Sequence, residues 1–308
     1  MGNSDDLMSR LCEKMPTFSK GQKRLANYIM TSYDKAVFLT AARLGKADAV
    51  SESTVVRFAM QLGYEGYPQF QEALEELVRT KLNSIQRIEI ASGQMSQSKV
   101  LEYILDADAE KIKLTKDEID KKAFEQAVET ISSARTIYVI GIRSCAPIAS
   151  FLSFYLNLIF DDVRNINTNN SSELFEQMIR INEEDVIIGI SFPRYSVRTL
   201  KALEFANNRN AKVIAITDSK HSPMNLYSSC NLLARSDMAS IVDSLVAPLS
   251  VVNALIVALC MKKKDKVINN LETLEEIWDE YQVYNKDELD VVSENVVEKF
   301  RNIGEKDE

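Results

Sequence analysis

The spacing of apolar residues divides the chain into two regions of different secondary structure. From Phe18 to Leu77, apolar side chains recur every three or four positions, and no alternating stretch is long enough for a strand. That period places them on one face of a helix. From Thr136 onward, short β-branched runs alternate with helical segments, and the runs TIYVI, DVIIGI and KVIAIT are continuously apolar. Such runs are typical of parallel strands covered on both faces. The pattern predicts an all-α module followed by a doubly wound α/β domain.

Start and stop signals inside the all-α module predict a helix-turn-helix. Ser19 can cap an early helix and Ser51 a later one, because a serine hydroxyl accepts a hydrogen bond from a helix-start amide. Between them we expect a short helix near 38–46 and a turn through 47–50. Gly63 ends the later helix at a position that tolerates left-handed backbone. The residues that face inward from this helix are Val55, Phe58, Ala59 and Leu62.

The segment 245–261 raises the question of a membrane-spanning helix. It is apolar over 17 residues, and three lysines follow it. However, a helix needs about 20 residues to cross the hydrocarbon core, and this run contains Pro248, Ser250 and Asn253. We therefore expect a buried helix that closes the α/β domain, and no membrane partner.

The boundary between the two regions is predicted from composition. Residues 84–99 are polar and contain Gly and Ser, which indicates a linker or a loosely held helix end. Two amphipathic helices, over 100–113 and 117–132, are expected to lead into the second domain. The predicted units are a helix-turn-helix domain over 1–81, a linker with connecting helices over 82–118, an α/β domain over 119–262 and a charged helical tail over 263–308.

Charge is distributed unevenly between the two regions. The chain has 308 residues and a formal net charge of -8, so no overall positive field attracts it to nucleic acid or anionic lipid. Residues 10–67, however, hold nine Lys and Arg against five Asp and Glu. With 27% charged residues, 9 Gly and 6 Pro, the composition excludes collagen-like and largely disordered classes. A modest positive excess confined to the small module suits binding of a polyanion.

Cysteine and histidine usage argues against metal and nucleophile chemistry. The four cysteines are far apart without a CxxC pair, and the first ten residues lack a signal-peptide core, so we expect a reducing, cytoplasmic location. The cysteines are interpreted as small buried side chains. His221 is the only histidine, and we place it on the surface, where no metal cluster or Ser-His-Asp set forms. We expect no metal, no cofactor and no catalytic residue.

The exposed side of the second helix of the helix-turn-helix carries the candidate DNA contacts. Ser51, Ser53, Thr54 and Arg57 lie at its start and outer side if Val55 and Phe58 face inward. Such a helix enters the major groove, where an arginine can bind guanine with two hydrogen bonds and hydroxyls reach bases or phosphates. The alternative is a three-helix interaction module whose polar face is only solvated.

Two strand-to-helix loops of the α/β domain carry the candidate ligand contacts. GIRSCA follows the first strand and SFPRYSVRT the third, at the edge where such sheets bind ligands. Hydroxyls and backbone amides at helix starts bind anions, and arginines add charge. The candidate residues are Arg143, Ser144, Cys145, Ser191, Arg194 and Ser196. Alternatively, Ser144 and Ser196 are only helix caps, and the arginines pair with surface carboxylates.

The N-terminal region resembles the RpiR family of bacterial transcription regulators. FSKGQKRLANYI, ARLGKADAVSESTVVRFAMQLGYEGYPQF and EALEELV carry the likeness. The family signature is filled by Ser51, Thr54, Val55, Arg57, Phe58, Leu62, Gly63, Tyr64 and Gly66. The resemblance implies a DNA-binding domain with Ser51 at the start of its recognition helix.

Residues 119–262 resemble the sugar isomerase (SIS) domain that this family carries behind its helix-turn-helix, which implies sensing of a phosphosugar. The family loop Gly-x-Gly-x-Ser becomes Gly141-Ile142-Arg143-Ser144-Cys145 here, and Ser-x-Ser-Gly-x-Thr becomes SFPRYS at 191–196. Arginine therefore replaces two glycines, and Cys145 stands where a serine would be. Of the family's loop pattern, only Gly141, Ser191 and the Ser196 hydroxyl are retained in this sequence. Either guanidinium groups now hold the anion, or phosphosugar binding has been lost or retuned.

Together these features predict a cytoplasmic regulator that binds double-stranded operator DNA and a sugar phosphate, and that works as a homodimer or homotetramer without turnover. The alternative function is a phosphosugar isomerase with a helical appendage. Isomerisation needs a general base, whereas the two loops offer hydroxyls and arginines but no carboxylate. Glu173 and His221 are the nearest candidates in sequence.

Overall fold

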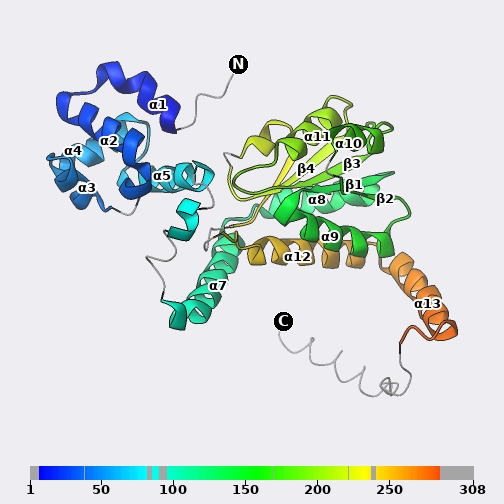
Figure 1. Cartoon of the computed structure of the whole chain (residues 1–308). Helices are drawn as coiled ribbons and strands as arrows, with labels where there is room; N and C mark the ends of the chain where they lie inside the picture. Colours follow the sequence, from blue (N-terminus) through cyan, green and yellow to red (C-terminus); the bar gives the residue numbers. More distant parts are fainter. Residues whose placement is uncertain are drawn as a thin grey trace.

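The computed structural model describes residues 7–37, 39–81, 85–89, 96–168, 170–220, 222–236 and 241–284. Within these ranges an α-helical N-terminal part precedes a C-terminal part built on one parallel sheet (Figure 1). The predicted fold class, an all-α helix-turn-helix domain followed by a doubly wound α/β domain, is confirmed.

The N-terminal helices have the ends that their capping residues dictate. The Ser19 hydroxyl and the Gln22 side chain form a reciprocal capping box at the start of α2, and Ser51 caps α4. The short helix begins at Ala41 rather than near Phe38, because the Thr40 hydroxyl caps it by accepting a hydrogen bond from the Arg43 amide. The helices are α1 (Leu7–Lys14), α2 (Lys20–Ala36), α3 (Ala41–Ala47), α4 (Glu52–Gln61) and α5 (Tyr67–Lys81).

These helices enclose an apolar core centred on α4. Val55, Phe58, Ala59 and Leu62 are buried, as predicted. The ring of Phe58 lies 5.0 Å from that of Phe18 and 5.9 Å from that of Phe70, between centroids. One side of α4 is therefore fixed against the other helices, and its polar side faces solvent.

The region expected to be a loose linker contains a defined contact. Residues 85–89 are helical, in agreement with the second of the two expected alternatives, a helix end, but the buried side chain of Arg87 shows that this part is not loosely held. Next come α7 (Val100–Glu118) and α8 (Lys121–Ser133), which both pack against α12 (Val246–Lys262). The predicted break at 114–116 lies instead at Ile119, because the Asp120 carboxylate caps α8.

The sheet has five parallel strands in the order β2-β1-β3-β4-β5. This order places β1 and β3 side by side at the centre, where the chain switches direction across the sheet. The strands are β1 (Ile137–Gly141), β2 (Val163–Ile166), β3 (Val186–Ile190), β4 (Lys212–Thr217) and β5 (Cys230–Leu233), and the helices between them are α9 (Ala146–Ile159), α10 (Ser171–Gln177) and α11 (Val197–Asn207).

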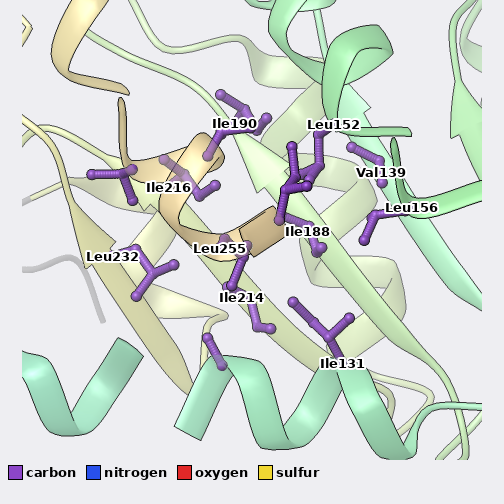
Figure 2. Packing of buried hydrophobic residues seen from close by; sticks show 14 of the residues in the cluster. Ile131, Val139, Leu152, Leu156, Ile188, Ile190, Ile214, Ile216, Leu232 and Leu255 are labelled. Atoms are coloured by element: carbon purple, nitrogen blue, oxygen red, sulfur yellow. The ribbon is translucent and has the colours of Figure 1, made fainter. Parts of the chain in front are cut away.

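Successive residues of the central strands point to opposite faces of the sheet, and both faces are covered. Ile188 and Ile214 pack with α8, α9 and α12 (Figure 2), whereas Ile187 and Val213 pack with α10 and α11. This double cover explains why the strand sequences are continuously apolar rather than alternating.

The apolar helix α12 is a core helix, as predicted. Val252, Leu255 and Leu259 on it are buried in the cluster shown in Figure 2. Among the described residues no single helix has the length and apolar character to cross a membrane; α12 passes that test only jointly with α13 (Lys264–Glu280), across a bend of 97°. The rest of the predicted helical tail, from 285 onward, lies outside the described residues.

Candidate functional site

The start of α4 presents a compact group of hydroxyls to solvent. The Ser51 Oγ atom lies 2.9 Å from Ser53 Oγ and 2.8 Å from Thr54 Oγ1, and Ser51 and Ser53 are exposed. Arg57 lies one turn further on, is exposed, and donates from Nε to the Ser53 carbonyl at 3.2 Å. The structure thus brings all four predicted DNA contacts together, with polar groups that can still accept or donate outward.

The turn between α3 and α4 is fixed by residues that the sequence patterns did not single out. Arg24 of α2 donates from Nη2 to the carbonyl oxygens of Asp48 and Ala49, at 3.1 and 3.0 Å. A Cβ atom at Gly45 would lie 2.8 Å from the Val50 carbonyl oxygen, so only glycine allows α3 to approach the turn this closely. These contacts set the angle at which α4 leaves the turn.

The ligand loops follow β1 and β3, which are hydrogen-bonded neighbours, so they start side by side at the carboxyl edge of the sheet. In the first loop, η3 (Arg143–Cys145) leads into α9, and Ser144 does not cap that helix. In the second loop, Ser191 Oγ accepts a hydrogen bond from the Ser196 amide at 3.1 Å, and Ser196 Oγ caps α11. Ser144 is therefore not a helix cap, whereas the Ser196 hydroxyl caps α11.

Both arginines that stand at family glycine positions adopt left-handed backbone. Arg143 has φ 59° and Arg194 has φ 63°, a region that costs a non-glycine residue of order 1 kcal/mol or more. Both side chains are exposed. The loops thus keep the backbone conformation that glycine favours while each adds a cationic side chain at the edge of the crevice.

Cys145 connects the two loops from a buried position. Burial raises the pKa of its thiol to about 11, against hydrogen bonds with the Phe192 backbone and the Ser144 side chain that lower it. The thiol is therefore protonated at neutral pH and inert as a nucleophile. The expectation of buried cysteines is confirmed for Cys145 and Cys230, whereas Cys260 is half-buried and the expectation is wrong for Cys12, which is exposed.

A carboxylate from the loop after β4 reaches the ligand loops, a contact that the sequence did not predict. Asp218, directly after β4, is buried and accepts a hydrogen bond from Tyr195 Oη at 2.9 Å. The two loops themselves contain no carboxylate, as the sequence indicates, but the loop after β4 brings Asp218 to the second of them. Since Thr217 Oγ1 also donates to Asp218, this carboxylate acts as an acceptor that fixes the second loop. Glu173, the earlier candidate, accepts hydrogen bonds from Thr168 and Gln177.

Substitution of Gly141, the last residue of β1, measures how closely the first ligand loop packs against the end of the strand. A Cβ atom there would lie 2.6 Å from the Cys145 carbonyl oxygen and 3.0 Å from Ala149 Cβ. We expect Gly141→Ala to lower the free energy of unfolding by about 1 to 3 kcal/mol, because both neighbours are held by helix backbone. Gly66→Ala is the control, since its Cβ would meet only Pro68 Cδ at 3.7 Å. Equal denaturation midpoints for the two variants would contradict this close packing.

The described residues show no metal-binding cluster, and the hollow lined mainly by apolar side chains does not suit an anion. In the described part of the chain no three His, Cys, Asp or Glu side chains gather as metal ligands. His221 lies outside the described residues. A separate hollow of about 520 Å³ between α7, α8 and α12 is lined mainly by apolar groups such as Ile112, Phe124 and Val251. No residue of the two ligand loops lines it, and its mainly apolar lining is unsuited to an anion.

Two protein-family models match this chain, one in each of its two parts. The model of the rpiR-family helix-turn-helix domain matches residues 6–81, and that of the SIS domain matches residues 130–258. The chain belongs to the RpiR family. The segments that carry the sequence resemblance, including the signature residues 51–66, lie inside the first match, and both ligand loops lie inside the second.

Relatives of the RpiR chain are named as transcriptional regulators. An uncharacterized HTH-type transcriptional regulator of Haemophilus influenzae is 26% identical over 230 residues, which are 74% of this chain and 79% of that protein. The HTH-type transcriptional regulator HexR of Escherichia coli is 22% identical over 292 residues, 88% of this chain and 93% of its own.

Solved structures agree on the fold of the RpiR chain. The sugar isomerase domain of an RpiR transcription factor from Sphaerobacter thermophilus matches with a TM-score of 0.56 and 26% identity, over 58% of this chain and 99% of that one. The NanR protein of Vibrio vulnificus, complexed with ManNAc-6P, matches with a TM-score of 0.52 and 23% identity, over 88% and 98% of the two chains.

Proposed function

We propose that this RpiR-family regulator binds operator DNA through α4 and senses a sugar phosphate in the crevice between the β1 and β3 loops. The observation that carries the proposal is the group of exposed Ser51, Ser53 and Arg57 with half-buried Thr54, held at one end of a helix whose opposite side is buried. A helix so presented fits the major groove, where an arginine can select guanine.

Phosphate contacts come from the basic residues around this helix. Lys20 and Lys23 lie at the start of α2, and Arg43 and Lys46 lie on α3; all four side chains are exposed. Together with Arg24 at the turn, they supply a positive surface to a chain of net charge -8. Because phosphate contacts release counterions, duplex affinity should fall steeply with salt.

The effector is an anionic sugar. Arg143 and Arg194 stand at the carboxyl edge of adjacent strands, and guanidinium groups hold phosphate with charge-assisted hydrogen bonds. NanR, which shares this fold, was solved with the sugar phosphate ManNAc-6P. Binding alters regulation only if the ligand favours one arrangement of the DNA-binding domains over another.

Loss of one loop arginine should weaken effector binding. We expect Arg194→Ala to reduce the affinity for a bound sugar phosphate at least tenfold, since one charge-assisted hydrogen bond contributes roughly 1.5 to 3 kcal/mol. Calorimetry with a panel of sugar phosphates measures this, with Arg209→Ala as a control, because Arg209 lies over the Phe205 ring on α11. An unchanged affinity would place the anion elsewhere.

The chain is expected to assemble at least into a dimer. Phe154 and Tyr155 on α9 and Val257 and Met261 on α12 are exposed, although both helices pack in the core. A two-fold pair would present two copies of α4 to half-sites about one helical turn, or a multiple, apart. Light scattering should give at least twice the 34.8 kDa chain mass; a monomer at micromolar concentration would contradict the palindromic operator.

Selection of duplexes from a random library by the full chain tests the proposed function. The proposal predicts a palindromic sequence whose binding weakens with salt. The alternative is isomerase activity in the SIS domain. Turnover of hexose or pentose phosphates, without enrichment of any duplex sequence, would favour that alternative.

A further inference from the structure

Arg87 is a buried cation that comes from the segment between the two domains. It lies in the helical residues 85–89, and its side chain is 3% exposed. Its Nη1 atom donates to Asp243 Oδ1 at 2.7 Å, and Asp243 is 22% exposed. A guanidinium group buried this fully requires a partner, so the contact fixes where the inter-domain segment meets the SIS domain.

Asp243 lies at the same edge of the sheet as the ligand loops. It precedes α12, and α12 packs beside α9, which begins directly after the β1 loop. Both helices follow strands of one parallel sheet, so both start at its carboxyl edge. Next to burial, the largest cause that raises the pKa of Cys145 is the negative charge of Asp243. Asp243 therefore lies at the edge where the ligand loops begin, close enough to Cys145 of the first loop for its charge to act there.

The loop that carries Asp243 is held to α7, which packs against α12 of the SIS domain, independently of Arg87. Ser244 Oγ donates to Asp108 Oδ1 of α7 at 2.5 Å. Arg235, at the start of the same loop, binds Glu118 of α7 through two hydrogen bonds of 2.6 Å. If the ion pair opens, Asp243 therefore stays in place, and Arg87 and its segment are the part that shifts.

We propose that Arg87 is a further anion-binding residue of the crevice, and that a phosphate bound there competes with Asp243 for its guanidinium group. The inference rests on the proposed effector site. An oxyanion between the β1 and β3 loops offers Arg87 the same charge-assisted hydrogen bonds as a carboxylate. Because residues 85–89 follow α5 of the DNA-binding domain by a few residues, a change of partner at Arg87 transmits occupancy of the crevice toward that domain.

Titration of the full chain with inorganic phosphate, by calorimetry at constant ionic strength, tests the inference. We expect Arg87→Gln to weaken phosphate binding at least tenfold and Asp243→Asn to strengthen it at least threefold. The double variant should equal Arg87→Gln, since removing the competitor matters only while Arg87 is present. Arg164→Gln is the control: it also opens an Asp–Arg pair, with Asp162, but at the amino edge of the sheet.

The outcomes separate this inference from the proposed function. Unchanged affinity in both variants, or changes of the same direction, would overturn the role of Arg87. If Arg194→Ala still abolishes binding in that case, the effector site itself stands. If the wild-type chain binds no phosphate, both fail. Should Arg87→Gln not fold by circular dichroism, Arg87→Lys replaces it, with a smaller expected loss; strengthening by Asp243→Asn is required in either case.

Discussion

Phe58→Ala should lower the free energy of unfolding of the helix-turn-helix domain by about 3 to 5 kcal/mol. Phe58 is fully buried on α4, and its ring contacts those of Phe18 and Phe70. Truncation removes these contacts and leaves a cavity that the surrounding helices cannot fill, because they are held by caps at Ser19 and Ser51.

The measurement has to report on the small domain alone, since two domains need not unfold together. Trp278 lies on α13, so its fluorescence follows the C-terminal part, and amide hydrogen exchange in α4 and α5 follows the N-terminal part. Met60→Ala is the control on the same helix, because Met60 is 56% exposed; it should change stability by less than about 0.5 kcal/mol. Equal exchange in both variants would contradict the inward orientation of Phe58.

Arg57→Ala should weaken binding to the selected duplex by about 1 to 3 kcal/mol while the chain stays folded. Arg57 is exposed on α4, one turn from Ser53, and reaches base edges if α4 lies in the major groove. Fluorescence anisotropy of a labelled duplex measures the loss.

The control separates base recognition from general attraction to phosphate. Lys46→Ala removes one exposed positive charge on α3, from the basic residues proposed to contact phosphates. It should lower the affinity for specific and unrelated duplexes alike, whereas Arg57→Ala should lower the specific affinity more. If both variants reduce binding to the same extent on every sequence, Arg57 does not read bases.

Local signals were enough to predict the secondary structure and the fold class. The caps at Ser19 and Ser51, and the end of α4 before Gly63, depend on neighbours within a few residues. The apolar strands follow from burial on both faces. The start of α3 was misplaced because an apolar residue such as Phe38 continues a helical pattern, while the cap at Thr40 sets the actual boundary.

Contacts between distant parts of the chain could not be predicted. Arg24 and Asp48, Arg87 and Asp243, and Tyr195 and Asp218 are brought together only by tertiary packing. From sequence alone, charged residues in polar segments are interpreted as solvated, and this is why residues 84–99 were interpreted as a linker or a loosely held helix end. The left-handed backbone at Arg143 and Arg194 was indicated only through glycine in the family pattern.

The most direct test of the account is the affinity of the full chain for its selected duplex, measured with and without a saturating sugar phosphate such as ManNAc-6P. Coupling between the two sites should change the duplex affinity by about 5- to 150-fold, and Arg194→Ala should abolish the change without altering affinity in the absence of ligand. Equal duplex affinity with every sugar phosphate that binds the chain would contradict an effector-controlled regulator.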